Sequence, residues 1–147
     1  MEIRRGLSCA LLKKYADAEK EALEIGCRGG RIAATGVRLF KKVQAEDLSG
    51  EMLRKSRETV TSSNVSYHKL DGFALKGFSD SSLDFVYSHV VFVQLSSLQV
   101  YPYLMEIQRV LKKGGVPSIR NLCFPWSGLC GHERNGHYLI FGGQSQV

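Results

Sequence analysis

The stretch ALEIGCRGGR, residues 22–31, is the feature that most constrains the fold of this chain. Apolar residues alternate up to Ile25, glycines follow, and a helical pattern begins at Arg31. Glycine accepts a positive φ and has no side chain, so such a turn lets the backbone approach a ligand closely. The stretch therefore predicts a strand, a ligand-binding turn and a helix. Arg28 is an exception, because it stands between Gly26 and Gly30 where a third glycine is expected.

Strand-like and helix-like segments alternate along the rest of the chain. The predicted strands span residues 22–27, 43–47, 65–69, 83–88 and 116–122, and the predicted helices span residues 8–20, 31–40, 50–60 and 98–112. The glycine pair 114–115 is expected to end the last helix. This alternation is typical of an α/β fold in which right-handed crossovers join parallel strands.

Composition places the chain among ordinary globular domains. It has 147 residues, is 44% hydrophobic and carries a net charge of +6. The basic residues occur as scattered pairs, which indicate either solvated helix ends or a mildly basic face for an anionic substrate such as RNA. No secretory signal opens the sequence, and no apolar run approaches the roughly 18 residues of a membrane span. Four cysteines without a C-x-x-C pair favour free thiols, and we expect one cytoplasmic domain over residues 1–147 without membrane contact.

Polar residues follow the predicted strands at the edge where ligands bind to parallel sheets. Asp47 follows the second strand, and its carboxylate can accept hydrogen bonds from both hydroxyls of a ribose. Asp71 and Gly72 follow the third strand, where Asp71 can accept a hydrogen bond from an amine such as that of adenine. The structural alternatives are that Asp47 interacts with a helix dipole and that Asp71 begins a turn. Together, these positions predict a nucleoside site.

A dinucleotide-binding dehydrogenase is the first alternative for such a site. Its fingerprint, G-x-G-x-x-G, would start at Gly26 and would require glycine at positions 28 and 31. The chain has Arg28 and Arg31 instead, so the fit is poor.

Five sequence blocks carry a resemblance to a known family. In order, they are LEIGCRGGR, AEDLSGEML, DGF, SSLDFVYSHVVFVQL and EIQRVLKKGG. This series resembles the class I S-adenosylmethionine-dependent methyltransferases over residues 23–115, and residues 116–147 form a divergent tail. The resemblance implies a Rossmann-like three-layer α/β/α sandwich, with a mostly parallel sheet of about five to six strands in a chain of this length. It also implies S-adenosyl-L-methionine as cofactor and methyl transfer to an unidentified acceptor, which is a small molecule, an RNA or a protein.

The resemblance assigns roles to the residues at the first two strand ends. Glu24 and Gly26 would lie against the methionine part of the cofactor, and the turn would continue through Cys27 and Gly30. Asp47 would bind the ribose hydroxyls. The residue after it, Leu48, would flank the adenine.

The third and fourth strand ends complete the implied site. Asp71 and Gly72 would contact the edge of the adenine, and Ser88 would face the reacting methyl group. His89 is the best-placed general base, because a histidine titrates near neutral pH. The alternative for His89 is a binding or packing role, since only some acceptors need a base.

Three departures from the family pattern keep a second function open. Arg28 replaces the middle glycine of the turn, so its φ must be negative and its side chain outward if the cofactor is to fit. Glu46 stands where an apolar strand residue is usual, and an unpaired acid buried there would be costly. The chain is also short for the seven-stranded sheet of the family. It is therefore either a methyltransferase or a non-catalytic methyltransferase-like partner subunit.

The tail is expected to complete the sheet. Residues 136–142 (GHYLIFG) are good strand formers and are predicted to fold back antiparallel onto the strand at 116–122. If they did not, the exposed edge would invite self-association. The tail also contains the metal-ligand types Cys123, Cys130, His132 and His137. We expect no metal there, because the gap between the cysteines is wider than in zinc sites.

Overall fold

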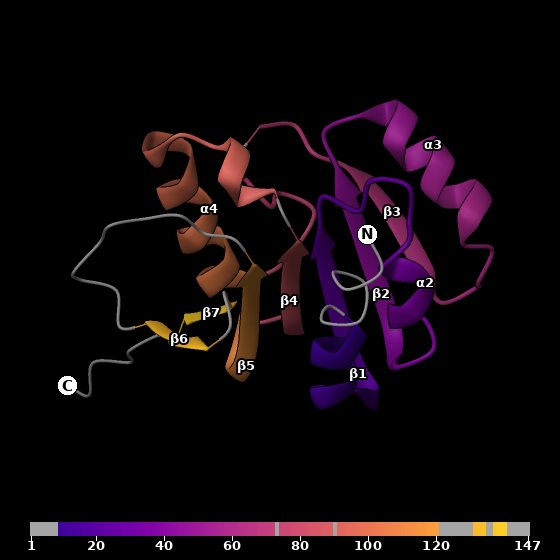
Figure 1. Cartoon of the computed structure of the whole chain (residues 1–147), viewed down its shortest axis with the longest axis horizontal. Coiled ribbons are helices and arrows are strands. Elements are labelled where there is room, and N and C mark those ends of the chain that lie inside the picture. Colours follow the sequence, from indigo (N-terminus) through magenta and orange to yellow (C-terminus); the bar gives the residue numbers. More distant parts are fainter. Residues whose placement is uncertain (1–8, 73, 90, 121–130, 135–136, 141–147) are drawn as a thin grey trace.

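The computed structural model describes residues 9–72, 74–89, 91–120, 131–134 and 137–140. They form one seven-stranded sheet in the order β3-β2-β1-β4-β5-β7-β6, with helices packed against it (Figure 1). A helix over residues 9–14 comes first. The elements that follow are β1 (Asp17–Ile25), α2 (Ala33–Gly36), β2 (Phe40–Asp47), α3 (Gly50–Thr59), β3 (Val65–Lys69), β4 (Leu83–His89), a 3-10 turn η1 (Phe92–Gln94), α4 (Ser97–Val110), β5 (Leu111–Arg120), β6 (Gly131–Arg134) and β7 (His137–Ile140).

The first five strands are parallel, and β1 lies between β2 and β4. The chain order reverses on the two sides of β1, which is the switch point of a doubly wound sheet. The structure thus confirms the predicted Rossmann-like α/β fold. It has more strands than the five to six expected, because β6 and β7 need only four residues each.

The predicted return of the tail onto β5 is confirmed at the residues that the structure describes. β7 pairs antiparallel with β5, with Tyr138 opposite Ile119 and His137 opposite Arg120. This pairing covers the edge of β5 that would otherwise have invited self-association. Sequence reasoning missed β6, which pairs antiparallel with β7, because residues 131–134 read as part of a glycine-rich turn.

Several element boundaries differ from the sequence prediction. β1 begins at Asp17 instead of residue 22, and α2 is a single turn of four residues. The glycine pair does not end α4 but lies inside β5, at an irregularity in its pairing with β4 between Leu111 and Val116. A Cβ on Gly115 would lie 2.9 Å from the carbonyl oxygen of Lys112, so this irregular stretch requires glycine.

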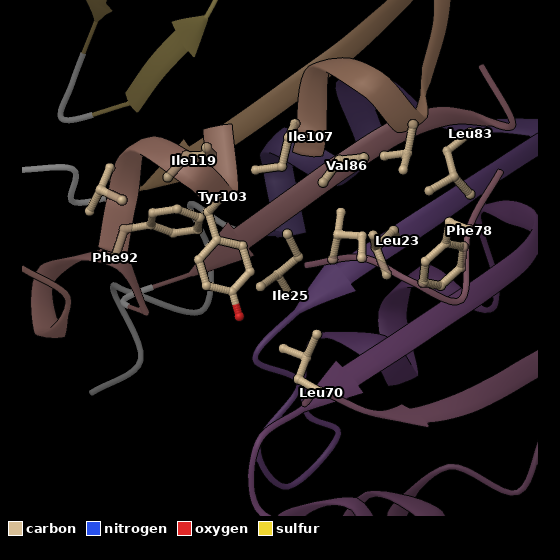
Figure 2. Packing of buried hydrophobic residues seen from close by; sticks show 13 residues of the cluster. Leu23, Ile25, Leu70, Phe78, Leu83, Val86, Phe92, Tyr103, Ile107 and Ile119 are labelled. Carbon is tan, nitrogen blue, oxygen red and sulfur yellow. The ribbon is translucent and has the colours of Figure 1, made fainter. Parts of the chain in front are cut away.

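Buried side chains lie on both faces of the sheet, because successive strand residues point to opposite sides. Leu23 and Ile25 of β1 pack with α4 in the larger cluster, shown in Figure 2. On the other face, Phe85 stacks on Phe40 and Tyr15, with ring centroids 5.5 and 5.2 Å apart. The sheet is therefore the middle layer of the fold.

Helix α4 packs against the sheet with a face that overlaps the inward face predicted from its sequence pattern. The pattern placed Leu104, Ile107 and Leu111 inward. The fully buried residues are Val100, Tyr103, Ile107 and Val110, and Leu104 and Leu111 are half-buried and pack against the same core cluster. Sequence periodicity therefore indicated the inward side of the helix but not all of its most deeply buried residues.

Helix α3 follows the sequence prediction closely. Ser49 caps its first turn, accepting a hydrogen bond from the Met52 amide, and Leu53 and Ser56 are buried. The part of the chain that the structure describes holds no helix with the length and apolar character of a membrane span.

Candidate binding site at the strand ends

The predicted site residues come together at one edge of the sheet. Ile25, the last residue of β1, stands opposite Glu46 in β2 and Ser88 in β4, and Asp47 stands opposite Lys69 in β3. The turns that follow these strands therefore begin side by side. This is the edge at which parallel α/β sheets bind ligands.

The turn after β1 is anchored to β2 through its backbone. The amides of Gly26 and Cys27 both donate to the carbonyl oxygen of Glu46, at 2.8 and 2.9 Å. The amide of Gly30 then donates back to the carbonyl oxygen of Cys27 at 2.9 Å. Gly26 and Gly30 both have a φ of +78°, a conformation that glycine adopts without steric cost.

The glycines at the strand ends have different reasons for lacking a side chain. A Cβ on Gly26 would lie 2.1 Å from a methyl carbon of Val91, and one on Gly30 would lie 2.6 Å from the hydroxyl oxygen of Ser56. These two positions are filled by the chain itself. A Cβ on Gly29 or Gly72 would meet no atom of the described residues within 4 Å, so these two open onto free space.

Arg28 occupies its place in a way that the sequence did not predict. Its φ is +51°, in the left-handed region that glycine favours, whereas the expected fit required a negative φ. The second part of the expectation is correct, because the side chain is exposed. The departure from the family pattern thus imposes backbone strain of about 1–2 kcal/mol, while the side chain does not enter the interior of the turn.

Asp47 organises the end of β2. The residue is 9% exposed, and its carboxylate accepts the amide hydrogens of Arg28 and Ser49, each at 2.9 Å. It thereby ties the turn after β1 to the start of α3. An ionised carboxylate offers about four acceptor positions, so two remain for hydroxyl groups of a ligand. The neighbouring Leu48 is 51% exposed, which leaves an apolar surface beside this carboxylate.

The turn after β3 carries an exposed acid. Asp71 forms an ion pair with Lys76, with 3.1 Å between the Oδ1 and Nζ atoms. Gly72 has a φ of +94°, and its carbonyl oxygen accepts a hydrogen bond of 3.2 Å from the hydroxyl of Tyr103. The Asp71 carboxylate therefore remains at the surface, where it can exchange its lysine partner for a ligand.

The end of β4 is tied to β1. Ser88 is 3% exposed, and its hydroxyl donates to the carbonyl oxygen of Ile25 at 2.9 Å. That hydrogen bond uses the hydroxyl proton within the sheet, so Ser88 can offer a ligand only its oxygen lone pairs. His89 follows at the strand end, is half-buried and stands opposite Arg120 of β5.

Glu24 and Cys27 form the buried floor of the turn. Glu24 is 2% exposed, and its carboxyl accepts a hydrogen bond of 3.3 Å from the Tyr87 hydroxyl. Burial raises its pKa to about 8, and the nearby negative charge of Asp47 acts in the same direction. Burial, with Glu24 beside it, also raises the pKa of the Cys27 thiol to about 12. At neutral pH both groups are therefore mostly protonated, and Cys27 is not a reactive thiolate.

Glu46, the acid at a strand position where an apolar residue is usual, is buried in the structure. It is 3% exposed, and its Oε2 atom has no hydrogen-bond partner among the residues that the structure describes. Burial raises the pKa of its carboxyl to about 8. The group therefore keeps its proton at neutral pH and avoids the larger cost of a buried charge.

Glu46 should make the stability of the fold depend on pH. A carboxyl with a raised pKa in the folded state contributes stability below its ordinary pKa of 4.5, and this stability is lost as pH rises to about 8. Glu46→Gln removes one such ionisation. We expect its unfolding free energy to decline less than that of the wild type between pH 5 and 8, by on the order of 2 kcal/mol.

Urea titrations of both proteins at several pH values measure this difference. The exposed Glu58→Gln serves as the control and should retain the wild-type slope. Some slope should remain in every variant, because Glu24 titrates over the same range. Parallel curves for wild type and Glu46→Gln would show that Glu46 ionises normally in the folded state.

Within the described ranges, no group of three or more histidine, cysteine, aspartate or glutamate side chains could hold a metal ion. Cys123 and Cys130 of the tail lie outside those ranges.

Sequence reasoning also missed Tyr103, whose hydroxyl contacts the turn after β3. Its only signal was a tyrosine at a helical position where an aliphatic residue would have sufficed.

Comparisons with known proteins identify the family that the chain resembles. The profile of the methyltransferase domain family matches residues 23–119, which is most of the chain. No curated protein sequence matches it significantly.

Three solved structures illustrate the likeness. A protein of Pyrococcus horikoshii OT3 is 28% identical, with a TM-score of 0.70, and the match covers 82% of this chain and 58% of that one. An S-adenosylmethionine-dependent methyltransferase from Mesorhizobium loti is 19% identical, with a TM-score of 0.65 and coverages of 75% and 51%. The [4+2]-cyclase SpnF is 22% identical, with a TM-score of 0.68 and coverages of 78% and 43%.

The last two likenesses are below 25% identity and show the fold alone. The chain spans about half the length of the solved structures that it resembles. The family match rests instead on the profile, which extends from the strand before the glycine turn to the end of β5. By its sequence profile and by the sheet that carries these strand ends, the chain belongs to the methyltransferase domain family.

Proposed function

We propose that this chain binds S-adenosyl-L-methionine across the ends of β1, β2 and β3 and transfers its methyl group to an acceptor. Asp47 carries the proposal. It is a nearly buried carboxylate that holds two backbone amides and keeps two acceptor positions for the ribose hydroxyls. The free space at Gly29 and Gly72 on either side of it fits a ligand that crosses the strand ends.

The remaining site residues divide the work of binding. The exposed Leu48 would cover one face of the adenine, and Asp71 with Gly72 would contact its edge. The protonated Glu24 and the Gly26 turn would line the methionine end. S-adenosylmethionine supplies a methyl group that is already activated on a sulfonium, so the protein mainly orients the reactants. His89 would accept the proton of an acceptor that must lose one.

A binding protein without catalytic activity is the second candidate. The left-handed backbone at Arg28 favours it, since a strained non-glycine residue in the turn departs from the pattern that binds the cofactor. The cyclase among the structural neighbours also has this fold, so the fold alone does not define the reaction. Under this second candidate, the chain would act as a partner subunit of another protein.

Calorimetry with S-adenosylmethionine and S-adenosylhomocysteine tests the proposal directly. We expect both to bind, and adenosine to bind more weakly because it lacks the methionine end. Failure of millimolar S-adenosylhomocysteine to release heat or raise the melting temperature would refute the proposal for this chain. Methyl-labelled cofactor mixed separately with small-molecule, RNA and protein fractions then distinguishes the two candidates, because only an enzyme transfers the label.

Arg28→Gly should relieve strain in the turn. Glycine accepts the φ of +51° and retains the amide that donates to Asp47. We expect the variant to gain about 1 kcal/mol in unfolding free energy, or about 2–4 °C in Tm, and to bind S-adenosylhomocysteine at least as tightly. Arg28→Ala is the matched control, because it removes the side chain but retains the strain.

Two measurements, urea unfolding and calorimetry, decide what Arg28 does. If Arg28→Gly and Arg28→Ala both lose affinity, the guanidinium contacts the cofactor carboxylate or an acidic acceptor, and the expectation that Arg28→Gly binds at least as tightly is wrong. If neither variant changes stability, the backbone at this position is not strained.

A further inference from the structure

We propose that helix α4 positions Gly72 and Leu75 after β3, and thereby lets this segment distinguish an amino-bearing purine from one without the amino group. The inference rests on the proposed function, because it places Asp71 and Gly72 at the purine edge of the bound cofactor. It adds three positioning residues that lie on α4 and not at the strand ends.

Three side chains of α4 reach the segment after β3. They are Tyr103, Glu106 and Arg109, and their spacing of three residues places them along one side of the helix. The Tyr103 hydroxyl donates to the carbonyl oxygen of Gly72 at 3.2 Å. Glu106 accepts the amide hydrogen of Leu75 at 2.8 Å, and Arg109 donates to the Leu75 carbonyl oxygen at 3.1 Å. Both backbone groups of Leu75 are therefore bound to α4.

Arg109 and Glu106 hold each other in a fixed geometry. The guanidinium donates through Nε to one oxygen of Glu106 and through Nη2 to the other, both at 2.8 Å. Its Nη1 atom also donates to the Phe78 carbonyl oxygen at 2.9 Å and to Asp80 at 2.7 Å. A bidentate pair restricts the guanidinium to one plane. The hydrogen bond from Arg109 lowers the pKa of Glu106, so the pair stays charged at neutral pH.

Tyr103 connects the same segment to the core. It is 1% exposed and packs edge-on against Phe92, with 5.5 Å between the ring centroids (Figure 2). Burial raises the pKa of its hydroxyl to about 12, so it remains a hydrogen-bond donor. Gly72 is thus held through its carbonyl oxygen, while the position of its missing side chain opens onto free space.

The placement of Asp71 follows from these contacts. Asp71 pairs with Lys76, which comes directly after Leu75. The side chains of Asp71 and Lys76 are both about 70% exposed or more. Such surface pairs contribute little and exchange readily with other partners. The backbone that α4 holds, and not the lysine, therefore decides where the Asp71 carboxylate lies when a ligand arrives.

Purine discrimination provides the test. We would measure the Kd of S-adenosylhomocysteine and of S-inosylhomocysteine, which has a carbonyl oxygen in place of the amino group. Wild type should prefer the adenine compound by about tenfold or more. The reason is that the Asp71 carboxylate accepts a hydrogen bond from the amino group, whereas the carbonyl oxygen has no hydrogen to donate. Arg109→Ala and Tyr103→Phe should reduce this preference to about threefold or less, and Arg109→Lys should restore only part of it, because lysine lacks the bidentate fork.

The controls separate positioning from general support. Arg54→Ala breaks an exposed ion pair on α3 and should retain the wild-type preference. If Arg109→Ala and Tyr103→Phe weaken both ligands by the same factor, α4 merely supports the fold and the inference is overturned.

Hydrogen exchange without ligand provides a readout that does not depend on cofactor binding. In Arg109→Ala, the amides of Leu75 and Phe78 should exchange faster, while those of β1 remain unchanged. If wild type binds neither nucleoside, the proposed function fails together with the purine discrimination. The exchange result then decides the positioning role alone: faster local exchange supports it, and unchanged exchange at both amides rejects it.

Discussion

Asp47→Ala is expected to lose most of its affinity for S-adenosylhomocysteine and part of its folding stability. The carboxylate accepts two backbone amides and is proposed to accept the ribose hydroxyls. Hydrogen bonds to a charged group are worth about 1.5–3 kcal/mol, which corresponds to a roughly 10- to 150-fold weaker Kd. The amides of Arg28 and Ser49 lose their acceptor as well, so we expect about 2 kcal/mol less unfolding free energy.

Calorimetry and urea unfolding separate these two effects. Asp47→Asn retains one acceptor oxygen and should lie between wild type and alanine in both measurements. Asp71→Ala is a second control, because that carboxylate is exposed and paired only with Lys76. Its stability should stay within about 0.5 kcal/mol of wild type. If Asp47→Ala loses stability but binds S-adenosylhomocysteine as wild type does, Asp47 organises the turns and does not contact the cofactor.

The strand ends were predictable from sequence because each depends on local chemistry. The apolar alternation before Gly26 and the acids at Asp47 and Asp71 identify the ends of three parallel strands without knowledge of their neighbours. Their convergence at one edge then follows from the topology. The return of the tail onto β5 was predictable for a similar reason, since a strand-forming segment follows a run of turn residues.

The features that sequence reasoning missed depend on contacts between distant segments. Arg28 has a positive φ and its amide donates to a carboxylate 19 positions later, whereas side-chain type alone predicts a negative φ. The contact of Tyr103 with Gly72 depends on the rotation of α4, which helical periodicity left open. The glycine pair in β5 resembled a helix end, because an irregular strand and a helix terminus both favour glycine.

Gly26→Ala should destabilise the fold strongly, whereas Gly29→Ala, three positions along the same turn, should not. At Gly26 the new Cβ would lie 2.1 Å from a methyl carbon of Val91, and the φ of +78° disfavours any side chain. The overlap and the left-handed backbone together should cost about 3–4 kcal/mol of unfolding free energy. At Gly29 a Cβ would meet no described atom within 4 Å, so the change should stay within about 0.5 kcal/mol.

Urea unfolding of the two single variants and of a double variant tests why each glycine is there. Val91→Ala removes the methyl carbon that opposes Gly26, so combining it with Gly26→Ala should recover the steric part of the loss but not the part due to φ. Gly29→Ala should instead bind S-adenosylhomocysteine more weakly, because its methyl group would enter the space assigned to the cofactor. If Gly29→Ala binds as wild type does, the free space there lies outside the ligand. If the double variant recovers nothing, Val91 is not what requires glycine at position 26.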